Sequence, residues 1–69
     1  MYPNLLAEMA RLKITQKELA AVLNITENTI GAKIRGEKDF KFGEMVVIRG
    51  IFGKSLDYLF ETDKDKRPA

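Results

Sequence analysis

Apolar residues recur along the chain at the three- and four-residue spacing of amphipathic helices, and polar caps or glycines separate the repeats. The pattern predicts helices over residues 1–13, 16–23, 27–35, 42–52 and 55–60. We therefore expect an all-α fold, a compact bundle of about five short helices. The side chains expected to face the core are Leu5, Leu6, Met9, Leu12, Leu19, Ala20, Val22, Leu23, Ile30, Ile34, Met45, Ile48, Ile51, Phe52, Leu56, Leu59 and Phe60.

Two helix starts follow each other closely in the middle of the chain. Thr15 and Glu18 form the Ser/Thr-x-x-Glu pattern, in which side chains and backbone amides at a helix start satisfy one another. Thr26 repeats the start signal. Asn24 tolerates the left-handed conformation that ends helices, and Gly36 stops the second helix. The stretch therefore predicts two short helices, set at an angle and joined by a tight turn.

This pair of helices carries the residues of a known motif. The matching positions are Gln16-x-x-Leu19-Ala20, Asn24-Ile25-Thr26, Thr29-Ile30 and Gly36. They resemble the Cro and cI repressor type of helix-turn-helix, the XRE family, and the similarity extends to about residue 60. The resemblance implies a lambda-repressor-like fold and a sequence-specific regulator of transcription that binds double-stranded DNA, similar to phage Cro and cI repressors. It also implies that the second helix, residues 27–35, enters the major groove.

The outward side of that second helix supplies candidates for reading bases. Helical spacing places Asn28 there, and its amide can pair with N6 and N7 of adenine. Thr29 and the methyl group of Ala32 can touch a thymine methyl group, and Glu27 can accept from N4 of cytosine. The alternative for Glu27 is that it only favours the helix start. Gly31 also falls on this side, which indicates that something approaches closely there.

The charge distribution favours the same segment as a DNA-binding surface. The net charge of the chain is +2, but residues 11–41 hold seven basic and four acidic residues, which leaves −1 for the remainder. Without the motif, this segment would be taken for a mixed-charge surface in contact with solvent. In similar proteins the Gln that opens the first motif helix binds a backbone phosphate. The candidate phosphate contacts are therefore Gln16, Lys17, Lys33, Arg35, Lys38 and Lys41.

The size and composition of the chain exclude several classes of protein. Sixty-nine residues make one domain, expected over residues 1–61 with a flexible charged tail over 62–69. The chain has no Cys and no His, which removes the usual metal ligands and general bases. We therefore expect no enzyme, no metal, no cofactor and no small-molecule ligand. No signal pattern and no apolar run of about 20 residues is present, so we expect a cytoplasmic protein without a membrane partner.

The fourth predicted helix carries an apolar stripe on its outer side. Gly43, Val46, Val47 and Gly50 recur there at i, i+3, i+4 and i+7. Glycines at both ends would let two such helices approach, so the stripe predicts a weak homodimer that binds a palindromic operator. The alternative is that two valines are simply tolerated on the surface. The rival function is a protein-interaction module of the same fold, such as an antitoxin or antirepressor, without specific DNA readout.

Overall fold

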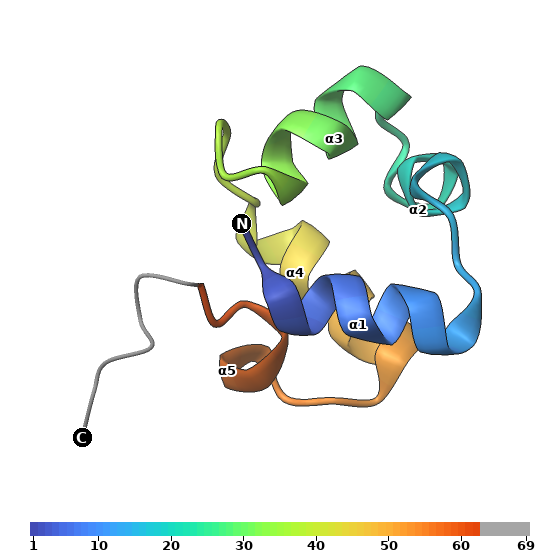
Figure 1. The fold of residues 1–69 in the computed structure, drawn as a ribbon. Helices are drawn as coiled ribbons and strands as arrows, with labels where there is room; N and C mark the ends of the chain where they lie inside the picture. The colour runs from blue at the N-terminus through green and yellow to red at the C-terminus, as the bar shows by residue number, and fades with distance from the viewer. Residues whose placement is uncertain (63–69) are drawn as a thin grey trace.

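The computed structural model describes residues 1–62, and the described residues form five α-helices and no strand (Figure 1). The predicted all-α fold is confirmed. The predicted charged tail lies outside the described residues except for Thr62. No helix in residues 1–62 is long and apolar enough to cross a membrane. The helices are α1 (Pro3–Leu12), α2 (Gln16–Leu23), α3 (Glu27–Ile34), α4 (Phe42–Phe52) and α5 (Leu56–Leu59).

Local capping sets the two motif helices where the sequence predicted them. The Thr15 hydroxyl accepts a hydrogen bond from the Glu18 amide at 3.1 Å, and the Glu18 carboxylate accepts from the Thr15 amide at 2.9 Å. Asn24 ends α2 in the left-handed conformation with φ of 58°. The Thr26 hydroxyl then accepts from the Thr29 amide at 3.1 Å and starts α3. Two residues therefore separate the end of one helix from the cap of the next, which makes the turn tight.

Each helix contributes one fully buried large side chain to a single core. These side chains are Leu5, Leu19, Ile30, Ile48 and Leu59. Because all five helices meet at one centre, the short α5 is held by packing more than by its own four residues.

Two apolar residues expected in the core are exposed. Leu12 is 39% exposed and Val22 is 57% exposed, so the prediction that they face inward was wrong. Leu12 is the last residue of α1, just before Lys13 turns the chain away in the left-handed conformation. Val22 lies about 60° around α2 from the buried Leu19, which places it outside the narrow stripe of an eight-residue helix.

An aromatic cluster holds the connection between α3 and α4. Tyr2, Phe40 and Phe60 meet edge to face, with ring centroids 5.1 to 5.7 Å apart. Phe40 lies on the connection, whereas the other two rings come from opposite ends of the described chain. Phe40 thus anchors the connection against the core. The anchored loop lies at the end of α3, beside the N-terminus of the chain (Figure 1).

Candidate nucleic-acid interface

The first turn of α3 is the part of the helix that the fold leaves accessible. Glu27 and Asn28 are exposed, and Thr29 is half-buried. The hydroxyl of Thr29 accepts a hydrogen bond from the Thr26 hydroxyl at 2.9 Å, so Thr29 is part of the cap. The amide of Asn28 makes no such local contact among the described hydrogen bonds and faces solvent. The structure therefore keeps together three of the four side chains that the sequence placed against bases.

The fourth, Ala32, does not face outward. It is 8% exposed, because the chain turns back over the end of α3. The Ala32 carbonyl accepts from the amide of Glu37 at 2.9 Å and from that of Lys38 at 3.4 Å. The prediction that the methyl group of Ala32 is displayed to a base was wrong. Gly31, also expected on the outer side, is buried as well.

The prediction that Lys33 contacts a phosphate was also wrong. It is 5% exposed, and its ammonium group lies 2.5 Å from the carboxylate of Glu44 on α4. The same carboxylate oxygen accepts from the Lys41 amide at 2.9 Å, which caps α4. Lys33 thus fastens α3 to α4 and is not displayed to a phosphate. Nothing local in the sequence marks this pair, because the two partners lie eleven residues apart.

The pKa of Glu44 reflects this position. Burial raises the pKa of the carboxyl group, but the hydrogen bonds from Lys33 and from the Lys41 amide act in the opposite direction. Together with the positive charge of both lysines they hold the pKa of Glu44 below its usual value of 4.5. The carboxylate is therefore ionised at neutral pH, and the ion pair with Lys33 persists.

Two of the expected phosphate contacts come together over Gly31. A Cβ atom built there would lie 3.1 Å from Nη1 of Arg35 and 3.4 Å from Oε1 of Gln16. Gln16 opens α2, whereas Arg35 follows the last residue of α3, so the fold joins side chains from two elements. The missing side chain at position 31 is what leaves room for both. The close approach expected at Gly31 is therefore made by two side chains of the domain itself.

The remaining cations around α3 are accessible. Lys17, Lys38 and Lys41 are exposed. Arg35 makes an ion pair with Glu37 at 2.8 Å, and both side chains are more than half exposed. The hydrogen bond from Arg35 lowers the pKa of the Glu37 carboxyl group. Because this pair is open to water, a competing phosphate can replace the carboxylate at little cost.

The outer face of α4 is apolar, as the stripe predicted. Val46 is 38% exposed and Val47 is 42% exposed. A Cβ atom at Gly43 or Gly50 would meet nothing within 4 Å. Phe42, predicted only as the first residue of this helix, is 72% exposed. Its four-residue spacing from Val46 was the signal that would have placed it on this face.

Comparison with known proteins identifies the family. A family model described as helix-turn-helix matches residues 5–59 of the 69. Neither the curated proteins nor the solved structures include a match to the chain. The matched segment holds the two capped helices, the turn at Asn24 and all five fully buried core side chains. The chain belongs to the helix-turn-helix family of the Cro and cI repressor type, a family of DNA-binding regulators.

Proposed function

We propose that this protein binds a specific double-stranded DNA operator and regulates transcription by occupying it, as a Cro-like or cI-like repressor. The observation that carries the proposal is the capped first turn of α3, exposed and polar, with accessible cations on the elements beside it. An element of this size fits the major groove, where each base pair shows a distinct pattern of donors and acceptors.

Asn28 is the side chain assigned to base readout with the clearest chemistry. Its amide donates and accepts at once, which matches N7 and N6 of adenine. Glu27 and Thr29 flank it on the same turn and complete the proposed reading surface. Replacing Asn28 by Ala removes a side chain that is exposed, so folding is unaffected.

Phosphate contacts are assigned to residues that surround α3. Gln16 and Arg35 meet over Gly31, and the exposed Lys17, Lys38 and Lys41 extend the positive surface. Such contacts fix the orientation of the protein on the duplex without reading sequence. Each phosphate contact also releases a counterion from the DNA, so the affinity for DNA falls steeply as the salt concentration rises.

The experiment begins with selection of bound duplexes from a random library by the wild-type protein. Enrichment of one sequence supports the proposal, whereas no enrichment together with salt-independent binding contradicts it and favours the protein-interaction function. Fluorescence anisotropy on the selected duplex then compares two variants. Asn28→Ala costs about 1–3 kcal/mol and relaxes the preference at one base pair. Lys38→Ala weakens binding to selected and random duplexes alike, and the salt slope falls by about 1.

A matched control is available in Lys54→Ala. Lys54 is exposed like Lys38, but it lies on the connection between α4 and α5, away from α3 in Figure 1. Removing it changes the net charge equally and leaves the proposed interface intact. An equal loss of affinity in both variants would show that overall charge, not a surface around α3, supplies the binding.

The operator is proposed to be palindromic and the protein to bind it as a weak homodimer. One recognition helix reads only a few base pairs, and a two-fold dimer places a second copy about one helical turn away. The stripe of Gly43, Val46, Val47 and Gly50 is accessible for this contact. Val46→Glu would leave binding to a single half-site intact and abolish cooperative binding to two half-sites, as measured by gel mobility shift. Undiminished cooperativity would place the dimer contact elsewhere.

A further inference from the structure

Phe42 is an aromatic side chain on the surface with no local structural task. It is 72% exposed, the highest value among the large apolar residues of the described chain. It opens α4, and Val46 and Gly50 follow it at four-residue intervals along one row of the helix surface. Arg49 is the single charged residue on this side of α4. A row that begins with so exposed an aromatic side chain is a surface available for a protein partner.

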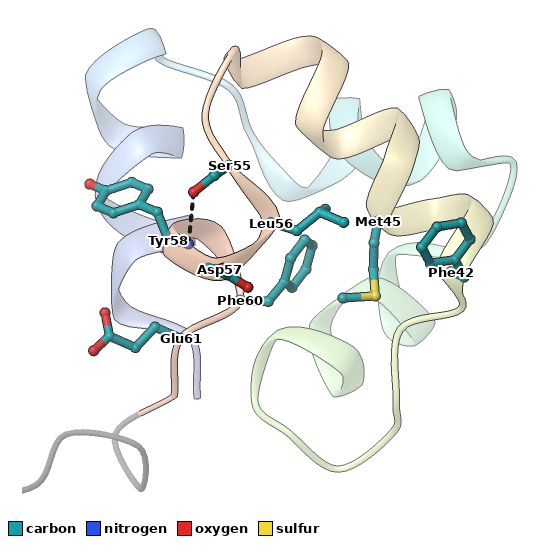
Figure 2. Close-up of a pocket in the computed structure, with 8 residues that line it drawn as sticks. All are labelled: Phe42, Met45, Ser55, Leu56, Asp57, Tyr58, Phe60 and Glu61. Carbon is teal, nitrogen blue, oxygen red and sulfur yellow. Dashed lines mark hydrogen bonds between the residues drawn. The ribbon is translucent and has the colours of Figure 1, made fainter.

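A groove lies directly beside Phe42. It runs between the first turns of α4 and the short α5, with a volume of about 820 Å³, and it is open to solvent. Its apolar lining comes from Met45, Leu56 and Phe60, whose side chains gather between the two helices, while Phe42 stands at one end (Figure 2).

The rim of the groove is acidic. Asp57 and Glu61 line it, and neither takes part in an ion pair with a described lysine or arginine. The row on α4 carries the opposite charge through Arg49. An apolar knob therefore lies next to an apolar groove with acidic lining residues, and a cation follows about two turns further along the same helix.

We propose that a second copy of this chain docks on this surface, with Phe42 of each copy seated in the groove of the other. An isologous contact requires one patch that is complementary to itself, and a knob beside its own groove meets that requirement. The positive charge of Arg49 on α4 and the acidic residues of the groove favour a second copy over an unrelated apolar partner. The proposal deepens the homodimer of the proposed function and rests on it. The proposal adds the Phe42 side chain and the groove between α4 and α5 to the α4 stripe, and these two features make the contact specific.

The area of the contact makes the dimer weak. A buried phenylalanine contributes about 150–250 Å², so the exposed part of Phe42 supplies on the order of 100–180 Å². With Val46 and Val47 the face remains well below the roughly 800 Å² per partner of a stable complex. We therefore expect association at roughly 0.1–1 mM protein in free solution and at lower concentrations on adjacent half-sites.

The first test uses the wild-type protein alone. Amide chemical shifts are followed by NMR while the protein is diluted from about 1 mM to 20 μM, a range chosen to span the expected association. The proposal expects concentration-dependent shifts at Phe42, Met45, Leu56 and Phe60, and none on the exposed face of α3. Shifts that do not depend on concentration, or that cluster on α3, would overturn it.

The second test asks whether knob and groove meet between copies. Phe42→Ala removes the knob and one end of the groove but keeps the lining by Met45, Leu56 and Phe60, whereas Met45→Glu places a charge in the groove and leaves the knob. Each variant alone is expected to lower the association constant at least tenfold by sedimentation equilibrium. In an equal mixture, the Phe42 side chain of one variant can enter the uncharged groove of the other, so association recovers in part. No recovery on mixing two folded variants contradicts the exchange.

Controls separate this proposal from the DNA-binding function. Leu12→Ala removes an exposed apolar side chain on a different helix, α1, and is expected to leave self-association unchanged. Binding of Phe42→Ala to a single half-site equals that of the wild type, while cooperative binding to two half-sites is lost. Loss of half-site binding would show that Phe42 contacts DNA and would overturn the docking surface. Self-association without any DNA binding would instead refute the proposed function and leave this surface standing. Should Met45→Glu fail to fold, the dilution series on the wild type still decides.

Discussion

The buried ion pair between α3 and α4 provides a prediction that the sequence alone would not have made. The side chain of Lys33 is 7% exposed and that of Glu44 is 12% exposed. Removing one partner of such a pair costs about 3–5 kcal/mol, because the other charge stays behind in a poorly hydrated site. In Lys33→Met the Glu44 carboxylate keeps the Lys41 amide as a donor and lies near the surface, which reduces the expected cost to about 2–3 kcal/mol.

That cost is large for so small a domain. A chain of 69 residues has roughly 3–10 kcal/mol of total stability. One kcal/mol shifts the melting temperature of a 60–100-residue domain by about 4–8 °C, so Lys33→Met lowers it by roughly 8–24 °C. Thermal unfolding followed by circular dichroism measures the shift directly. Urea unfolding at 25 °C gives the free energy of unfolding for comparison.

Two further variants identify the cause. Lys33→Met combined with Glu44→Leu removes both charges together and regains part of the lost stability, since an apolar pair of similar volume replaces a buried ion pair at little net cost. The recovery is incomplete because the Lys41 amide loses its acceptor at the start of α4. Glu37→Gln breaks the exposed pair with Arg35 and leaves the melting temperature unchanged. A Lys33→Met protein that melts with the wild type would refute the reasoning, because Lys33 would then be in solvent. A double variant no better than the single one would refute the electrostatic explanation.

Three other outcomes follow from single features of the structure. The pKa of Glu44 is lowered on folding, so the contribution of this carboxylate to stability is complete above about pH 4.5 and is lost as the pH falls through the folded pKa. Acid unfolding, monitored by circular dichroism, is therefore expected to begin at lower pH in the Lys33→Met, Glu44→Leu double variant, which lacks this carboxylate. Gly31→Ala removes a flexible residue from a helix interior and stabilises the fold by about 0.5–1 kcal/mol in thermal unfolding. The same variant weakens DNA binding because the new methyl group displaces Arg35, and unchanged affinity would show that the Arg35 side chain is not a phosphate contact. Thr26→Ala removes the cap of α3 and costs about 1 kcal/mol in urea unfolding, and a smaller loss would indicate that packing alone holds the helix start.

The sequence by itself determined the helices and their ends, because the groups that decide them lie within a few residues of each other. Thr15 and Glu18 satisfy one another across one turn, and Thr26 caps the next helix in the same way. Asn24 and the spacing of apolar residues then place the turn. These signals, together with the resemblance they carry, were enough to predict the helix-turn-helix and the exposure of Asn28.

Only the tertiary structure decided which side chains near the motif are free to meet a partner. The sequence pattern places Lys33 on the surface, but in the structure α4 places Glu44 against it. The pattern also displays Ala32, but the following loop folds back and hydrogen-bonds to the Ala32 carbonyl. Conversely, the sequence marks Phe42 only as the start of a helix, whereas the structure shows that its side chain is exposed beside a groove. Helical spacing fixes the direction of a side chain from its own axis, but burial depends on neighbours supplied by distant segments. Because those neighbours are chosen by packing, the pattern of one helix does not contain them.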